Sequence, residues 1–321
     1  MRVNIADRRR RVDDVSETMA FFNNRIMPLK DANVNIATHA FNYGTGVFEG
    51  LRAYWSEKNQ DLYIVQAAPH YARLLRSARL LHIEVPYTVE ELVDWTRELM
   101  RVNHFRQDVY IRPLAYKADA AIKVGLSGLQ SAFAMFALPM GDYVSRDGIK
   151  AQVSSWRRIA DNMIPSRAKV TGAYVNAALS SDQAKSDGYD EAILLGDDGQ
   201  VSEASSANLF MVRQGTLITT PVTADILEGI TRQVVFDLAQ SAGIPTEIRP
   251  VDRTELYQAD ELFLCGTGVQ LAGIVEVDRR PIADGAPGPI TAQLQERYFH
   301  LVRGEDEEFR HYVTAVYGEN S

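Results

Sequence analysis

The chain has 321 residues, of which 46% are hydrophobic and 24% charged, and a formal net charge of −8 at pH 7. Single cores stop growing at about 250 to 300 residues, so this length predicts two domains of an ordinary globular protein. The acidic balance argues against a nucleic-acid partner, which needs a basic face. No apolar run approaches the roughly 20 residues that span a bilayer, so no membrane partner is expected. The single cysteine, Cys265, excludes an intrachain disulfide and fits a reducing cytoplasm.

The first part of the chain predicts short strands and two helices. Strands are expected at 18–22, 25–29, 46–55, 61–66, 109–115 and 132–138. Asn23-Asn24 is a favourable turn pair for a hairpin between the first two strands. Residues 69–83 form an amphipathic helical pattern, and a second helix starts at Thr88, where Glu91 completes a capping box. A basic run at Arg8–Arg11, enclosed by acids, indicates a solvated terminal arm.

Residues 139–148 mix proline, glycine and charge, which is typical of a linker. We therefore expect a small N-terminal domain over 1–139, an interdomain loop over 140–149 and a larger C-terminal domain over 150–321.

The second part again alternates strands with a few helices. Strands are expected at 150–155, 190–195, 208–212, 216–220, 245–251, 261–265 and 274–277, and helices at 172–186, 230–242 and 290–303. Gly243 ends the middle helix as a C-terminal glycine. Many short strands with few intervening helices favour α+β domains with mixed or antiparallel sheets over a doubly wound parallel sheet.

Two glycine patterns suggest a dinucleotide site but do not fit one. In Gly44 to Gly50 the third glycine comes one residue late, and Gly266-Thr267-Gly268 leads into a strand-like segment where the fingerprint needs a helix. The six histidines show no ligand spacing, so no metal site is expected.

Lys169 is the most informative single residue. It stands among small and apolar residues in a chain with only seven lysines. Burial disfavours an ammonium ion and leaves a nucleophilic amine that can form a Schiff base. A pyridoxal phosphate partner would need donors for its phosphate and a carboxylate for its ring nitrogen. The helix start at Gly229-Ile230-Thr231, the Gly266-Thr267-Gly268 turn and Glu203 are candidates. Each of these features is weak evidence by itself, because Lys169 could equally be a surface lysine and Gly229-Ile230-Thr231 could be a simple helix cap.

Six segments together carry a resemblance to a known family. They are HAFNYGTGVFEGLRAY (39–54), YIRP (110–113), IPSRAKVTGAY (164–174), SEASSANLF (202–210), LEGITR (227–232) and CGTG (265–268). In this order and spacing the chain resembles the class IV aminotransferases, which are fold type IV pyridoxal-phosphate enzymes, and within them the branched-chain amino acid aminotransferases. The similarity runs from Phe21 to about Val302. It implies a two-domain α+β fold, with a small N-terminal α/β sandwich-like domain and a larger C-terminal pseudo-barrel domain.

The resemblance also assigns residues to pyridoxal 5′-phosphate. Lys169 carries the cofactor as a Schiff base and moves the α-proton, Glu203 pairs with the ring nitrogen, and Tyr174 binds the phenolic oxygen. Arg73 binds the phosphate, although without the family it reads as a helix arginine with a buried stem. The other implied cofactor positions are Ser206, Ile230, Thr231 and Thr267.

The implied substrate pocket is lined by Tyr43, Phe48, Gly50, Tyr110, Arg112, Tyr143, Thr267 and Gly268. Tyr110 and Arg112 share one strand face at period two, and such a pair can hold the side-chain carboxylate of glutamate. The expected reaction passes the amino group of leucine, isoleucine or valine to 2-oxoglutarate, in a cytoplasmic homodimer or higher homo-oligomer.

Departures from the family pattern restrain the substrate assignment. They occur at Asn42, Met140, Ser206 and the stretch 122–128. A D-amino acid aminotransferase, an (R)-amine transaminase or an aminodeoxychorismate lyase would use the same cofactor site, and the Tyr110–Arg112 pair argues against all three. A non-catalytic binder and a nicotinamide enzyme are the readings from other classes.

Overall fold

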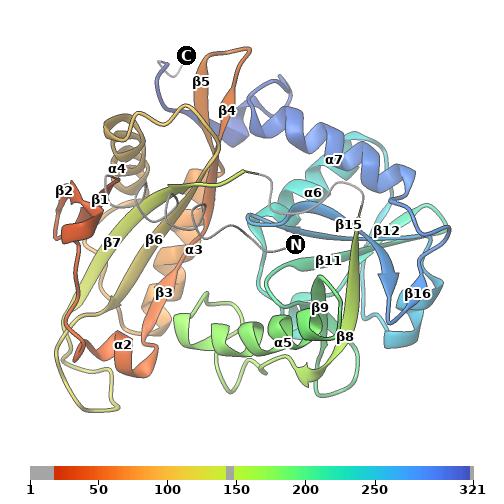
Figure 1. Ribbon diagram of the computed structural model, residues 1–321, viewed down its shortest axis with the longest axis horizontal. Coiled ribbons are helices and arrows are strands. Elements are labelled where there is room, and N and C mark those ends of the chain that lie inside the picture. Colours follow the sequence, from red (N-terminus) through yellow and green to blue (C-terminus); the bar gives the residue numbers. More distant parts are fainter. Residues whose placement is uncertain (1–17, 142–147, 319–321) are drawn as a thin grey trace. The chain divides into compact units, whose positions relative to one another are not determined.

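The computed structural model describes residues 18–141 and 148–318. The chain divides into two compact units, of which the first comprises Met1–Gly141 and Val302–Ser321 and the second Asp142–Leu301 (Figure 1). The basic run at Arg8–Arg11 and the substrate candidate Tyr143 lie outside the described residues.

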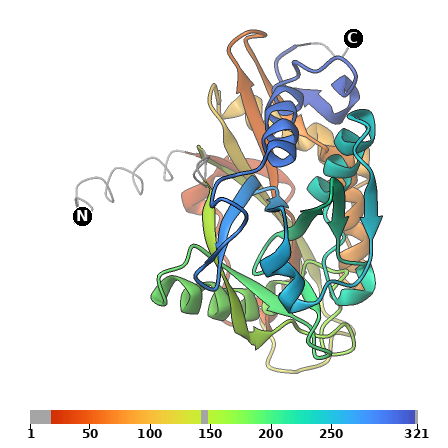
Figure 2. The same ribbon diagram turned by 90° about the vertical axis from the view of Figure 1, so that its right-hand side faces the viewer.

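The last residues of the chain belong to the first unit, whereas the sequence-based division placed all of 150–321 in one domain. Strand β17 (Val313–Ala315) pairs antiparallel with β5 (Asp61–Val65), so the C-terminal segment lies beside the β4–β5 hairpin (Figures 1 and 2). The predicted bounds of the interdomain loop stay a prediction.

The first unit is built on an antiparallel sheet with the strand order β17-β5-β4-β6-β7-β1-β2, and β3 pairs with β6. The other strands are β1 (Met19–Phe22), β2 (Arg25–Pro28), β3 (Gly46–Phe48), β4 (Leu51–Ser56), β6 (Val109–Lys117) and β7 (Ser131–Pro139). The predicted hairpin is confirmed, because Asn23 and Asn24 both have positive φ, 50° and 62°, as a type I′ turn requires.

Three α-helices accompany this sheet in the described residues: α2 (His39–Tyr43), α3 (Ala67–Leu80) and α4 (Val89–Val102). The predicted capping box starts α4: the Glu91 N–H donates to Thr88 Oγ1 at 3.2 Å, and the Thr88 N–H donates to Glu91 Oε2 at 2.8 Å. The short helix α2 was not expected from the sequence.

One face of β6 packs against the helices. The hydroxyl groups of Tyr71 on α3 and Thr96 on α4 lie 3.1 and 3.4 Å from the sulfur of Met135, which pairs with Pro113. Odd-numbered residues of β6 therefore face α3 and α4 and are buried. Since side chains alternate along a strand, Tyr110 and Arg112 project from the opposite face.

The strand expected at 46–55 is interrupted at Glu49-Gly50. The pairing register with β6 continues across the interruption, with Phe48 opposite Leu114 and Leu51 opposite Ile111. The Glu49 N–H donates to the Pro113 carbonyl at 3.0 Å, but a proline has no N–H to return the bond. The residues 46–55 by themselves do not reveal that a proline of β6 lies opposite Glu49.

The second unit contains a mixed sheet with the order β10-β9-β8-β15-β14-β11-β12-β13, and β16 pairs with β15. Strands β8–β9, β8–β15 and β12–β13 pair in parallel and the other pairs are antiparallel, as the predicted α+β class allows. The strands are β8 (Ile149–Arg157), β9 (Glu191–Leu195), β10 (Val201–Ala204), β11 (Asn208–Arg213), β12 (Thr216–Thr219), β13 (Thr246–Ile248), β14 (Glu261–Gly266), β15 (Gln270–Val277) and β16 (Arg280–Pro281).

The helices of this unit are α5 (Tyr174–Ser186), α6 (Ile230–Ser241) and α7 (Pro289–Val302). Strand β10, which carries Glu203, was not predicted. Strand β15 follows the Gly266–Gly268 turn, so the helix that a dinucleotide fingerprint requires is replaced by a strand, as expected.

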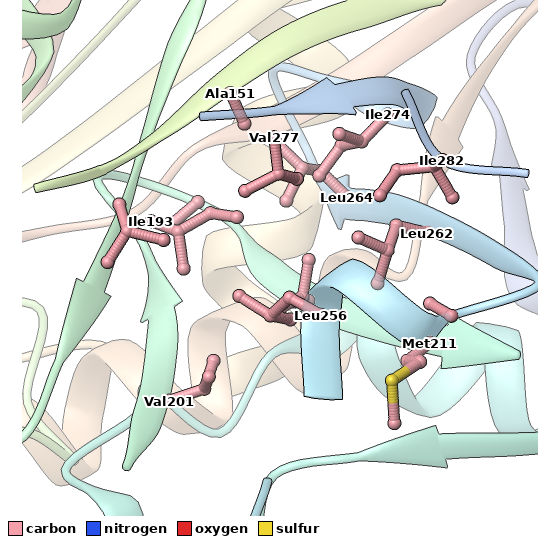
Figure 3. Packing of buried hydrophobic residues seen from close by; sticks show 14 of the residues in the cluster. Ala151, Ile193, Val201, Met211, Leu256, Leu262, Leu264, Ile274, Val277 and Ile282 are labelled. Atoms are coloured by element: carbon pink, nitrogen blue, oxygen red, sulfur yellow. The ribbon is translucent and has the colours of Figure 1, made fainter. Parts of the chain in front are cut away.

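Branched aliphatic side chains from most of these strands form a single buried cluster. Figure 3 shows Ile193, Leu264 and Ile274, from three different strands, around Leu256. Within the described residues, no helix is both long and apolar enough to cross a membrane.

Candidate active site

Lys169 lies in the loop before α5, half-buried between the buried residues Ala168 and Val170. Its amine donates a hydrogen bond to the hydroxyl of Tyr174, the first residue of α5, and lies 5.0 Å from the centre of the tyrosine ring. The loop is held upstream, where the Ser166 N–H and hydroxyl donate to Asp161 Oδ1 at 3.1 and 3.0 Å. The fold therefore holds the Lys169 amine in contact with the Tyr174 hydroxyl.

Glu203 is buried, with 4% of its surface exposed, and its carboxylate contacts Arg158, Asn208 and the backbone of Leu227. Its Oε1 lies 2.8 Å from a guanidinium nitrogen of Arg158, and its Oε2 accepts from the Asn208 amide at 2.8 Å. The Leu227 N–H lies 3.3 Å from both oxygens. Charge-assisted hydrogen bonds of this kind hold a carboxylate in place as an acceptor.

The start of α6 provides backbone donors near this carboxylate. The helix begins after Gly229, and no side chain of the described residues caps it. Its first residues are Ile230 and the buried Thr231. The N–H groups of a first helical turn and the helix dipole favour an anion, so this end suits a phosphate.

Thr267 and Gly268 lie in the turn between β14 and β15. Asn208 pairs with Cys265 across β11 and β14, which brings this turn beside the loop that carries the exposed Ser206. In the second unit, Glu203, the start of α6, the turn at 267–268 and the loop that carries Ser206 therefore all lie near Asn208, the first residue of β11.

Four of the predicted pocket residues meet in the first unit. Arg112 donates to the Tyr110 hydroxyl at 2.9 Å, and its guanidinium carbon lies 4.4 Å from the centre of the Phe48 ring and 5.1 Å from that of Tyr110. A β-carbon at Gly50 would lie 2.1 Å from the Tyr110 hydroxyl oxygen. The Nε atom of Arg112 is buried without a hydrogen-bond partner among the described residues. The cluster can therefore bind a carboxylate.

Tyr43 lies elsewhere in the first unit, on α2, with its ring centre 4.7 Å from that of His39. Of the chain next to Tyr143, the structure describes Met140 and Gly141, whose carbonyl oxygens accept hydrogen bonds from Arg52 at 2.5 and 3.0 Å.

Arg73 takes part in a buried ion pair. Its Nε and one terminal nitrogen donate to the two oxygens of Glu49 at 2.6 and 2.8 Å, and His70 Nδ1 lies 2.8 Å from Glu49 Oε2. Burial raises the pKa of Glu49, but the charge and hydrogen bonds of Arg73, with those of His70, outweigh burial and hold that pKa well below its ordinary value. The aliphatic part of the Arg73 side chain is buried, as expected for this helix position, and the guanidinium is buried as well.

Sequence reasoning missed Glu49, Arg158 and Asn208. Glu49 could have been noticed, because it is the one acid in the apolar run from Gly44 to Trp55. Arg158 and Asn208 carry no local signal: an arginine after a strand and an asparagine among small residues are common.

A sequence model of the family described as "Amino-transferase class IV" matches residues 46–277. The chain belongs to the class IV aminotransferases. It is 47% identical to the "Probable branched-chain-amino-acid aminotransferase" of Aquifex aeolicus, over 94% of this chain and 98% of that relative. The branched-chain aminotransferase of the archaeon Thermoproteus uzoniensis, solved with norvaline, superposes with a TM-score of 0.90 at 41% identity and covers 94% of this chain and 99% of its own.

A further similar structure contains the cofactor. The branched-chain amino acid aminotransferase of Thermobaculum terrenum, solved in its PLP (holo) form, has a TM-score of 0.89 at 38% identity, over 94% of this chain and 99% of that one. These neighbours confirm the predicted fold class. The second unit also fits pyridoxal phosphate by its own geometry, since it presents an amine beside a phenol, a compensated buried carboxylate and an uncapped helix start.

Proposed function

We propose that this class IV aminotransferase transfers the amino group of leucine, isoleucine or valine to 2-oxoglutarate, giving branched 2-oxo acids and glutamate, with pyridoxal 5′-phosphate as cofactor. The Lys169–Tyr174 pair, in the same unit as the buried Glu203, is the observation that carries the proposal. When bound, the cofactor supplies a carbonyl for the amine and a ring that accepts electrons from the substrate.

Each residue of this unit then has a defined task. The Lys169 amine holds the cofactor and moves the proton at the substrate Cα. The Tyr174 hydroxyl orients that amine and binds the phenolic oxygen of the cofactor. Glu203 accepts the ring N–H and so keeps the proton on that nitrogen, where it favours electron flow into the ring.

Backbone and hydroxyl donors hold the phosphate in this proposal. Ile230 and Thr231 offer the first N–H groups of α6. Thr267 and Ser206 offer hydroxyls from the two adjacent loops. By resemblance to the family, Arg73 is a further phosphate ligand, and within its own unit the bidentate contact with Glu49 fixes the plane of its guanidinium.

The pocket in the first unit supports a substrate with either a branched or an acidic side chain. Phe48 and Tyr110 provide aromatic surface, and Arg112 provides a guanidinium for the side-chain carboxylate of glutamate. Tyr43, Gly50, Tyr143 and Gly268 complete the set by resemblance to the family. A D-amino acid or (R)-amine transaminase is the second candidate, and an assay of L-leucine, D-alanine and an aryl amine as donors to 2-oxoglutarate separates the two.

Covalent trapping tests the proposal directly. After borohydride reduction, peptide mapping should find the cofactor mass on the Lys169 peptide, and Lys169→Ala should abolish both this adduct and turnover. Lys185→Ala, in the last turn of α5, is the matched control and should behave as the wild type. An unmodified Lys169, or turnover of Lys169→Ala close to the wild-type rate, refutes the assignment.

A homodimer, or a higher homo-oligomer in the cytoplasm, is the assembly that we propose. Large apolar side chains of the first unit are strongly exposed at Val34 (50%), Ile36 (81%), Phe41 (71%), Ile122 (79%) and Val124 (81%). A β-bridge between Thr38 and Ala120 joins the two segments that carry them. Exposed apolar patches mark association surfaces, and light scattering of wild type and Val124→Asp tests whether a second copy covers this one.

A further inference from the structure

The side chain of Asn208 contacts both Glu203, the proposed acid for the ring nitrogen, and the segment that leads into α6, whose start is the proposed phosphate site. It extends from the start of β11 and is 5% exposed. Its amide nitrogen donates to Glu203 Oε2 at 2.8 Å and to the Leu227 carbonyl at 3.0 Å. Both amide hydrogens are thereby used. The Leu227 N–H returns a contact to Glu203 at 3.3 Å, which closes a ring of three residues.

The amide oxygen of Asn208 occupies the space beside Gly229. A β-carbon at this glycine would lie 1.9 Å from Asn208 Oδ1 and 3.1 Å from the Arg232 β-carbon. Gly229 has φ −68°, which any residue adopts. The glycine is therefore needed for the close approach of Asn208 and not for an unusual backbone conformation.

We propose that Asn208 is a positioning residue, which fixes the acid for the ring nitrogen at a set distance from the phosphate donors. One short, buried side chain contacts the Glu203 carboxylate and the segment 227–229 that leads into Ile230 and Thr231. This inference rests on the proposed function for the identity of both ligand groups. Aspartate cannot replace the amide, because it offers no N–H donors and adds a second negative charge beside Glu203.

The first experiment measures cofactor binding to Asn208→Ala and to Asn208→Asp, which keeps the side-chain shape if the alanine variant does not fold. The control is Thr219→Val, which removes another buried hydrogen bond of this sheet, from the Thr219 hydroxyl to the Leu209 carbonyl at 2.7 Å. Dissociation constants of pyridoxal phosphate and of pyridoxal are compared, together with the pH midpoint of the bound cofactor's absorption band.

Loss of a hydrogen bond to a charged group should weaken binding about 10- to 100-fold. Both Asn208 variants should weaken binding of pyridoxal phosphate and of pyridoxal by at least the lower figure. They should also shift the pH midpoint, because Glu203 then holds the ring proton differently. Thr219→Val should change neither quantity beyond about twofold. Wild-type constants and an unmoved midpoint in both Asn208 variants overturn the inference.

A double-mutant cycle tests whether Asn208 acts through Glu203. The pyridoxal affinity of Asn208→Ala/Glu203→Gln should lie within about twofold of Glu203→Gln alone. Effects that multiply would show a merely structural role and overturn the inference. Gly229→Ala should weaken binding of pyridoxal phosphate, and Asn208→Ala should restore part of it by removing the clash with Oδ1; absence of any rescue counts against the contact.

The two proposals fail separately. A folded wild-type protein that does not bind pyridoxal phosphate rejects the proposed function. A wild-type protein that binds the cofactor, beside Asn208 variants that bind it equally well, rejects only the positioning role.

Discussion

Two buried carboxylates, Glu49 in the first unit and Glu203 in the second, are compensated in different ways. Glu49 is fully buried and receives two bonds from Arg73 and a contact from His70, both on α3. Glu203 is almost as buried, and its contacts include a terminal nitrogen of Arg158 together with the neutral donors of Asn208 and Leu227.

The origin of the partners explains the difference. His70 and Arg73 are three residues apart on one helix, so a single helix face delivers both. These partners of Glu203 come from the residue after β8, the start of β11 and the loop before α6. A carboxylate whose two oxygens both bind one guanidinium is suited to holding that arginine in one orientation. A carboxylate whose contacts come from several segments and include neutral donors is suited to receiving a proton donor from a ligand.

The largest difference between the two should appear in catalysis. Glu203→Gln should lower kcat about 100-fold or more, because a neutral amide does not keep the proton on the ring nitrogen, and removal of one preorganised electrostatic contact has this magnitude. Single-turnover kinetics with L-leucine measure the effect. A kcat of Glu203→Gln within tenfold of the wild-type value would show that Glu203 does not have the proposed catalytic role.

Stability should respond more strongly at Glu49. Glu49→Gln should lower the free energy of unfolding by about 3 to 5 kcal/mol, because Arg73 is left as a buried charge without its carboxylate. Urea denaturation measures the change. The double variant Glu49→Gln/Arg73→Met should regain much of the loss; equal stability of the single and double variants would contradict a buried-charge origin.

The pH dependence of stability should sharpen the contrast. The pKa of Glu49 is lowered in the folded state, so its stabilising contribution is complete above the ordinary glutamate pKa, about 4.3, and is lost as pH falls below it. Wild type should therefore lose stability between about pH 5 and pH 2 more steeply than Glu49→Gln. Parallel curves for the two proteins would show that Glu49 is not the group responsible.

The smallest change in the free energy of unfolding is expected for an exposed ion pair. Lys150 and Glu276 lie 3.2 Å apart with 52% and 24% of their side chains exposed. Lys150→Gln should change the free energy of unfolding by less than about 1 kcal/mol, because solvent screens such pairs. A loss comparable with that of Glu49→Gln, measured by the same urea titration, would mean that burial does not decide these energies.

Local sequence determined much of this protein. The Asn23-Asn24 turn and the Thr88–Glu91 capping box follow from the chemistry of adjacent residues, and the structure confirms both. The six segments, which include those around Lys169 and Glu203, together indicated the family and its cofactor, because their combined order and spacing are typical of that family. The site assignments carried over from these motifs stay proposals.

Only the tertiary structure decided how the candidate residues are supported. Arg158 stands 45 residues before Glu203 in the chain, and Leu227 stands 24 after it. Pro113 interrupts the strand at Glu49-Gly50 from a neighbouring strand, and Asn208 makes a glycine necessary at position 229. Local propensity and spacing describe residues within a few turns of one another. Contacts between distant segments depend on sheet register and strand order, which pair residues that no short pattern links.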